Sequence, residues 1–298
     1  MATVAVVGTG RMGSAMARSL AQGGIDLVLH NRTPERAEAL ANELGASLAA
    51  SPAEAAAAAE VAITMLADGP AVEATWGGPD GLIAGARDGS VLVDMSTVPP
   101  ETLPALAGAV RARGAGILDA PVSGSVSLAE SGQLTIMAGG SDDDLERARP
   151  TLEKLAKGIT HVGPLGSGHA LKLAVNALIF ALNGGVSEAL VLAERAGIER
   201  AVAYDVFAGG AAGAPYIGYK RQAFVDPDAT PVAFSLDLAA KDLRLITQLA
   251  ERLGVPMEQT RVNQRLVADA MDLLGPERDA SSVAIHLREL TKEGALGR

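Results

Sequence analysis

The first half of the chain alternates short apolar runs with stretches of helical periodicity. Residues 12–22 place their apolar side chains on one helical face, and Thr33-Pro34 indicates another helix start, because Thr caps helices and Pro suits their first position. Ser141, with Asp144 three residues later, is a third helix start. Such alternation predicts βαβ units and a mostly parallel sheet. Apolar runs predict its strands at residues 3–7, 25–30, 61–66, 90–95, 116–118 and 134–138.

From about Ser167 the pattern changes to one helix after another. Residues 168–195 contain no Pro and are mostly Ala, Leu, Val and Asn, which predicts one helix roughly 40 Å long. Because its apolar residues lie nearly all round, we expect it to be buried, within the subunit or across a subunit interface. The boundary between the halves is expected near residues 163–166. Further helices are predicted at residues 199–208, 231–254, 258–274 and 281–293.

A glycine-rich segment follows the first predicted strand and opens the first predicted helix. In this context its G-x-G-x-x-G pattern predicts a dinucleotide site, with glycines for the tight turn, the approach of the pyrophosphate and close helix packing. The N–H groups at the helix N-terminus would bind the phosphates. The sequence thus predicts an α/β Rossmann dinucleotide-binding domain over residues 1–163 and an all-α domain over residues 164–298. The segment consists of Gly8, Thr9, Gly10, Arg11, Met12 and Gly13.

The end of the second predicted strand indicates which dinucleotide binds. An NAD site usually carries Asp or Glu about 20 residues after the glycines, bound to the ribose 2′-hydroxyl. This chain has Asn31, Arg32 and Thr33 instead. The Arg32 guanidinium suits a 2′-phosphate, and Thr33 and the following helix N-terminus would add donors. The pattern therefore favours NADP(H), with NAD(H) as the alternative; the structural alternative is an Arg32 that is simply solvated.

Composition narrows the classes of partner. The 298 residues carry 25 Lys and Arg against 35 Asp and Glu, a net charge of −10, without a basic tract, which argues against nucleic-acid or anionic-membrane partners. The absence of Cys excludes disulfides, thiolate zinc and cysteine nucleophiles. The spacing of the four scattered His argues against a histidine metal site and leaves a carboxylate site as the alternative, so no metal is expected. No run reaches 18 apolar residues and no signal-peptide pattern opens the chain, so we expect a soluble cytoplasmic protein.

Three further blocks accompany the glycine segment. Residues 119–125 read Asp-Ala-Pro-Val-Ser-Gly-Ser, residues 166–176 read Gly-Ser-Gly-His-Ala-Leu-Lys-Leu-Ala-Val-Asn, and residues 241–243 read Lys-Asp-Leu. In this order, nearly end to end, the blocks resemble the β-hydroxyacid dehydrogenase family, which includes 3-hydroxyisobutyrate dehydrogenase and the glyoxylate/succinic semialdehyde reductases. Thr9 is a departure, since many members carry Leu there. The resemblance implies hydride transfer between a nicotinamide and a small carboxylate-bearing semialdehyde or hydroxyacid.

Lys172 and Asn176 are the candidate catalytic residues. They lie four apart on a predicted helix and therefore share a face. A lysine on so apolar a helix either reaches solvent or lies in a cleft, where burial would lower its pKa and suit general acid/base catalysis. The resemblance implies that Lys172 exchanges a proton with the substrate oxygen and that Asn176 orients the substrate.

The resemblance implies further site residues. Ser123 and Gly124 would bind the substrate carboxylate, although a Ser in such a turn also bonds its own backbone. Phe234 resembles a family aromatic near the active site. His169 is expected to be structural, and Asp242 to be an ion-pair partner of Lys241 or an acceptor of N–H groups. On the cofactor, the resemblance places Met65 and Leu66 at the adenosine, Ser96 and Thr97 at the nicotinamide ribose, and Lys241 at the nicotinamide end.

Two other functions stay open. The first is an imine reductase of related architecture. Such enzymes typically carry Asp or Tyr at the position of Lys172 and lack the Ser-Gly turn, which argues against this function. The Gly- and Ala-rich residues 209–214 favour it. A cofactor-bound scaffold with little turnover is the second. The long apolar helix favours subunit contacts, and the resemblance implies a homodimer, with a tetramer as the alternative.

Overall fold

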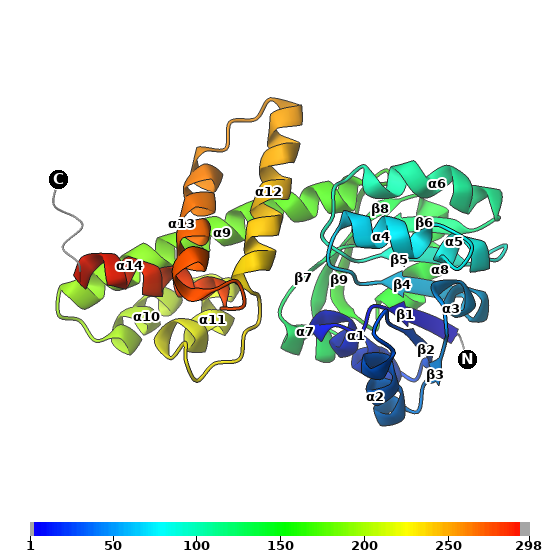
Figure 1. Ribbon diagram of the computed structural model, residues 1–298, viewed down its shortest axis with the longest axis horizontal. Helices are drawn as coiled ribbons and strands as arrows, with labels where there is room; N and C mark the ends of the chain where they lie inside the picture. Colours follow the sequence, from blue (N-terminus) through cyan, green and yellow to red (C-terminus); the bar gives the residue numbers. More distant parts are fainter. Residues whose placement is uncertain (1–2, 293–298) are drawn as a thin grey trace. The chain divides into compact units, whose positions relative to one another are not determined.

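The computed structural model describes residues 3–292 (Figure 1). The chain divides into two compact units, with the division between Lys172 and Leu173. The first unit is α/β, whereas the described part of the second contains helices and no strand. This confirms the expected fold class. The expected boundary, after residue 163, lies just before the helix that continues from the first unit into the second.

The first unit is built on one sheet, and all six predicted strands are present. Its order is β3-β2-β1-β4-β5-β6-β8-β7, with β9 paired to β8. Neighbours from β3 to β6 are parallel, while β8 runs antiparallel to β6 and β7, so the mostly parallel sheet is confirmed. The strands are β1 (Thr3–Val7), β2 (Asp26–His30), β3 (Ser47–Leu48), β4 (Val61–Thr64), β5 (Val91–Asp94), β6 (Gly116–Asp119), β7 (Val122–Ser123), β8 (Leu134–Gly140) and β9 (Ala156–Gly163).

Helices cover both faces of this sheet (Figure 1). Because strand side chains alternate, Val4 and Val6 of β1 enter one apolar core with α1, α2, α7 and α8, while Ala5 and Val7 enter a second with α3 to α6. These helices are α1 (Arg11–Gln22), α2 (Pro34–Leu44), α3 (Pro52–Ala58), α4 (Gly69–Trp76), α5 (Leu82–Gly85), α6 (Thr102–Ala112), α7 (Val126–Glu130) and α8 (Asp142–Leu152).

Two of the predicted helix starts can be compared with the structure. Ser141 caps α8, since its hydroxyl accepts a hydrogen bond from the Asp144 N–H at 3.2 Å, as expected. Thr33 occupies the N-cap position of α2 with Pro34 behind it, but its side chain makes no capping hydrogen bond. The position of Thr33 at the start of the helix was therefore predicted correctly, whereas the expected capping hydrogen bond is absent.

The second unit is helical throughout its described residues. Each predicted helix is present, but the one expected at 231–254 begins only at Leu236, because the Asp279 carboxylate binds the N–H groups of Ala233 and Phe234 outside any helix. The helix at 215–225 was not predicted, and residue 293 lies outside the described residues. The elements are α9 (Ser167–Arg195), α10 (Arg200–Gly209), α11 (Pro215–Val225), α12 (Leu236–Leu253), α13 (Glu258–Leu274), a short 3₁₀ helix (Ala280–Ser282) and α14 (Val283–Lys292).

Helix α9 is continuous, as predicted, but part of its apolar surface is exposed to solvent in this chain. Phe180 packs in a core with α12 and α13, whereas Leu178 and Leu192 are 64% and 72% exposed. By length and hydropathy alone, α9 is long and apolar enough to span a membrane. The count of consecutive apolar residues did not detect this. In its most apolar 18-residue window, 44% of the residues are buried. The core helix of a soluble protein meets the same criterion.

Candidate active site

The glycine turn lies where the strand order of the sheet reverses, between β1 and β4. Gly8 has φ +101°, and a Cβ there would lie 2.4 Å from the Met65 carbonyl oxygen. A Cβ on Gly13 would lie 1.9 Å from the Gly8 oxygen, so both positions require glycine. Apart from Gly10 and its chain neighbours, no atom of the described residues lies within 4 Å of the Cβ position of Gly10, and the first turn of α1 has no acidic residue. The turn therefore fits a pyrophosphate at the N-terminus of α1.

Asn31 ties this turn to the end of β2. Its Oδ1 accepts a hydrogen bond from the Thr9 N–H at 3.0 Å, and its Nδ2 donates to the Thr33 carbonyl at 2.9 Å. Arg32 and Arg36 are exposed, and neither guanidinium has an ion-pair partner among residues 3–292. Asn31 therefore stabilises the turn, and the guanidinium groups of Arg32 and Arg36 are exposed near it in the sequence.

The loops after β4 and β5 are joined by one side chain. Ser96 is buried, and its hydroxyl accepts a hydrogen bond from the Leu66 N–H at 2.8 Å while donating to Asp94 Oδ1 at 2.8 Å. The hydroxyl is thus used within the protein. Met65, Leu66 and Thr97 are half-buried on the same loops.

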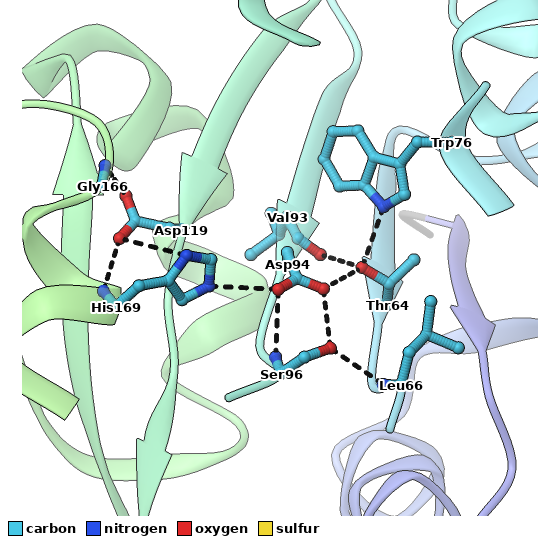
Figure 2. Close-up of polar contacts among 9 residues, drawn as sticks. All are labelled: Thr64, Leu66, Trp76, Val93, Asp94, Ser96, Asp119, Gly166 and His169. Carbon is cyan, nitrogen blue, oxygen red and sulfur yellow. Dashed lines mark hydrogen bonds and ion pairs between the residues drawn. The ribbon is translucent and has the colours of Figure 1, made fainter. Parts of the chain in front are cut away.

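A buried polar cluster lies at the carboxyl ends of β5 and β6 (Figure 2). Asp94, Asp119 and His169 are each 0% exposed. His169 Nε2 lies 3.1 Å from Asp94 Oδ2, and the His169 backbone N–H donates to Asp119 Oδ2 at 2.7 Å. Among the described residues, His169 Nδ1 has no hydrogen-bond partner, and it lies 3.9 Å from Asp119 Oδ2. His169 is thus deeply embedded, as expected of a structural histidine, yet one ring nitrogen is unsatisfied.

Asp94 accepts four hydrogen bonds within this cluster. Besides His169 and the Ser96 hydroxyl, the donors are the Ser96 N–H at 3.3 Å and the Thr64 hydroxyl at 2.6 Å. Thr64 in turn accepts from Trp76 Nε1 at 3.2 Å. Because a carboxylate oxygen accepts, the donor in the contact with His169 is the imidazole Nε2–H. For Asp119, burial raises the pKa, against the opposing charge of His169 and the N–H groups of Gly166 and His169.

The Ser123–Gly124 turn ends β7 as the chain enters α7. Gly124 has φ +149°, and Ser125 caps α7 through the Leu128 N–H at 3.3 Å. Ser123 is half-buried, and within residues 3–292 its hydroxyl makes no hydrogen bond, to its own turn or elsewhere. The alternative of a hydroxyl that bonds its own backbone is therefore wrong.

Lys172 lies three residues after His169 on α9 and is half-buried. Asn176 is one turn further along the same helix, in the second unit. Within that unit Asn176 Nδ2 donates to Asp242 Oδ2 at 2.7 Å, and Lys241 Nζ lies 2.9 Å from Asp242 Oδ1. Asp242 is therefore both the ion-pair partner of Lys241 and an acceptor of an N–H group, the two roles expected of it. Phe234, also in this unit, lies with its ring centroid 6.2 Å from that of Phe180.

Reasoning from the sequence missed the roles of Asp94, Asp119 and the Asn176–Asp242 bond. A signal was present for the two aspartates, because β5 and β6 read Val-Leu-Val-Asp and Gly-Ile-Leu-Asp, so two otherwise apolar strands end on a carboxylate. Buried carboxylates need partners. Among the described residues no group of three or more His, Asp or Glu is arranged to hold a metal ion.

The chain is similar to known oxidoreductases along nearly its whole length. Residues 3–163 match the NAD binding domain of 6-phosphogluconate dehydrogenase, and residues 166–287 match the NAD-binding region of NADP-dependent 3-hydroxyisobutyrate dehydrogenase. The chain is 34% identical over 289 residues to 3-sulfolactaldehyde reductase of Escherichia coli K12, covering 97% of this chain and 96% of that protein.

Two solved structures have the same fold. The 3-hydroxyisobutyrate dehydrogenase of Salmonella typhimurium has a TM-score of 0.87 and 28% identity, covering 96% of this chain and 99% of the other. Psf3, in complex with NADP+ and 2-OPP, has a TM-score of 0.86 and 26% identity, covering 95% and 99%.

Proposed function

The chain belongs to the β-hydroxyacid dehydrogenase family of NAD(P)-dependent oxidoreductases that act on CH–OH donors, and from this premise we propose that it is an NADP(H)-dependent reductase of a small carboxylate-bearing semialdehyde. The reverse reaction is oxidation of the corresponding hydroxyacid. The observation that carries the proposal is the placement of Lys172 relative to the edge of the sheet.

That placement follows from the parallel strands of the first unit. The carboxyl ends of β1, β4, β5 and β6 lie at one edge, which carries the glycine turn. Asp94 and Asp119 end two of these strands and bind the first turn of α9 through His169. Lys172 is three residues further on α9, within one helical turn of His169, and this position supports a role at the edge where such sheets bind their ligands.

Three observations support NADP(H) over NAD(H). No acidic residue follows β2 at the position where an NAD site would bind the ribose 2′-hydroxyl. Arg32 and Arg36 are exposed there instead, and a guanidinium pairs well with a phosphate. One structure of similar fold contains NADP+. The glycine turn would hold the pyrophosphate, with Met65, Leu66, Ser96, Thr97 and Lys241 along the rest of the cofactor.

The residues of this chain then have separate tasks in the reaction. When bound, the nicotinamide supplies or accepts the hydride. Lys172 donates a proton to the carbonyl oxygen during reduction and removes it from the hydroxyl during oxidation. The Ser123 hydroxyl and the Gly124 N–H bind the substrate carboxylate. Asn176 orients the substrate through Oδ1, since its Nδ2 is bound to Asp242, and Phe234 contributes an apolar contact.

We also propose that the enzyme is a cytoplasmic homodimer or tetramer. The exposed apolar residues of α9, Leu178 and Leu192, support self-association, because water-exposed leucines on one helix are favourable sites for a partner chain.

The test is NADPH consumption by the purified protein with glyoxylate, succinic semialdehyde, methylmalonate semialdehyde, tartronate semialdehyde, 3-sulfolactaldehyde and one cyclic imine, each repeated with NADH. Turnover of a semialdehyde, faster with NADPH, supports the proposal. Turnover of the imine alone overturns it in favour of the imine reductase reading.

Lys172→Ala tests the proton-transfer role within the same assay. It should lower kcat by about 10²–10⁴-fold and leave NADPH affinity unchanged. Lys157→Ala, which removes an exposed lysine of β9, is the matched control and should leave kcat unchanged. Equal kcat in both variants would favour the scaffold reading.

A further inference from the structure

The Asp94–His169–Asp119 cluster is more elaborate than packing requires. Its three ionisable side chains are each 0% exposed, although water solvates such groups far better than a protein core does. Two carboxylates and one imidazole are stable there only if each is hydrogen bonded. The partners they use lie at the end of β4, in the loop after β5 and at the start of α9.

Asp119 fixes the start of α9. Its Oδ1 accepts the Gly166 N–H and its Oδ2 accepts the His169 N–H, both at 2.7 Å. These N–H groups lack partners within the helix, and a negative charge beside a helix N-terminus is favourable. The contact leaves no room for a side chain at Gly168, where a Cβ would lie 2.3 Å from the Met137 carbonyl oxygen. The first turn of α9 is therefore held tightly on β6 and β8.

Asp94 fixes the other side of the cluster. Through the Ser96 hydroxyl it is connected to the Leu66 N–H, and through the Thr64 hydroxyl to Trp76. His169 Nε2 joins this set to α9 (Figure 2). The imidazole is thus the one side chain in this cluster that belongs to α9 and contacts Asp94.

We propose that His169 is a positioning residue for hydride and proton transfer: through Asp94 it holds the loops after β4 and β5 in register with the turn of α9 that carries Lys172. The inference rests on the proposed function, in which those loops contact the cofactor and Lys172 moves the proton. A displacement of about 1 Å between reacting groups lowers rates about 10²-fold, so a link of this kind acts on kcat.

The chain provides its own reporter of the link. Trp76 is the single tryptophan of the sequence, and its Nε1 donates to Thr64, which donates to Asp94. Fluorescence excited at a wavelength selective for tryptophan therefore reports on the loop side of the cluster, independently of turnover.

The experiment compares His169→Leu with His169→Gln in the full chain. Leu removes the donor to Asp94, whereas Gln offers an amide N–H of similar reach that does not titrate. His286→Gln is the matched control, because His286 is also buried but lies in the second unit. For each variant we would measure the melting temperature, the NADPH dissociation constant, kcat and KM with the best substrate, and Trp76 emission.

A positioning role predicts that His169→Leu lowers kcat about 30- to 100-fold in folded protein, shifts Trp76 emission and changes substrate KM less than threefold. His169→Gln should recover kcat to within about tenfold of the wild type, and His286→Gln should change neither kcat nor emission. If His169→Leu lowers only the melting temperature and keeps kcat within threefold, the residue is merely structural and the inference is wrong.

Two safeguards separate the possible failures. If His169→Leu does not fold, Asp94→Asn replaces it, and the same loss of kcat with shifted emission is expected. A wild type that reduces none of the semialdehydes overturns the proposed function, and Trp76 emission in the variants then decides by itself whether His169 is coupled to the loops. An active wild type with unaffected variants overturns the positioning role alone.

Discussion

Asn176 donates its side-chain amide to Asp242 at 2.7 Å, and Asp242 at the same time pairs with Lys241 at 2.9 Å. Asn176 is 7% exposed and Asp242 1% exposed, so little water screens either contact. One buried carboxylate therefore orients both a proposed substrate contact and a proposed cofactor contact. The arrangement fixes the amide of Asn176 so that Oδ1 is the atom left for a ligand.

Replacing Asn176 by Asp should disturb this arrangement strongly. The variant replaces a hydrogen bond with two carboxylates at contact distance, which should lower the free energy of unfolding by about 3 kcal/mol and raise substrate KM. Denaturant unfolding and steady-state kinetics measure the two effects. The same substitution at Asn42, exposed on α2, is the control and should change neither. An unchanged KM in folded Asn176→Asp would remove Asn176 from the substrate site.

The Lys220–Asp279 pair should make the second unit sensitive to acid. Lys220 is 4% exposed, and its Nζ lies 2.7 and 2.8 Å from the two Asp279 oxygens. Burial opposes ionisation of Asp279, but Lys220 and the N–H groups of Ser281 and Phe234 outweigh it and lower the pKa. A carboxyl with a lowered pKa contributes stability above its unfolded pKa of about 4 and loses it as the pH falls through the folded value.

Lys220→Met therefore should lower the free energy of unfolding by about 3–5 kcal/mol at pH 7, because it leaves a buried carboxylate unpaired. Between pH 5 and pH 3 the wild type should lose stability more steeply than the variant. Urea unfolding at several pH values measures both effects, with Lys157→Met as the control for loss of an exposed lysine. Parallel pH curves for wild type and Lys220→Met would show that another group sets the acid limit.

The elements that could be predicted are those whose pattern is local. The strands β1, β2, β4, β5 and β6 are apolar runs buried on both faces, and the glycine turn depends on neighbours within the same segment. The edge strand β9 was missed because it reads Ala-Lys-Gly-Ile-Thr-His-Val-Gly and is largely exposed, which leaves no apolar run. Its strand partner is β8, and this pairing depends on the tertiary fold and not on the local sequence of β9.

The site was predictable only in part for a related reason. Lys172 and Asn176 stand out because they are polar on an apolar helix. The partners that hold the site in place are distant in sequence: His169 lies 75 residues from Asp94 and 50 from Asp119, and Asn176 lies 66 from Asp242. No spacing rule connects residues so far apart, so these bonds appear only when the sheet and helices are in place.

Arg32→Ala should weaken NADPH selectively. If the guanidinium binds the 2′-phosphate, its loss removes charge-assisted hydrogen bonds of about 1.5–3 kcal/mol, or roughly 10- to 100-fold in KM for NADPH. KM for NADH should change less than threefold, because that cofactor has no 2′-phosphate. Arg265→Ala, which removes an exposed arginine of α13, should affect neither cofactor. A parallel rise for NADPH and NADH would place Arg32 outside the 2′-phosphate site.

The exposed apolar row on α9 should control self-association. Leu178 and Leu192 are 64% and 72% exposed, whereas Phe180 and Leu190 of the same helix pack in the apolar cores of the second unit. Leu192→Glu would place a charge in a contact between copies, and burying an unpaired carboxylate is costly, so the assembly should dissociate. Light scattering at micromolar concentration should give an oligomer for the wild type and a smaller species for the variant. Leu273→Glu, at a 52% exposed leucine near the end of α13, is the control, and equal masses in all three proteins would place the subunit contact elsewhere.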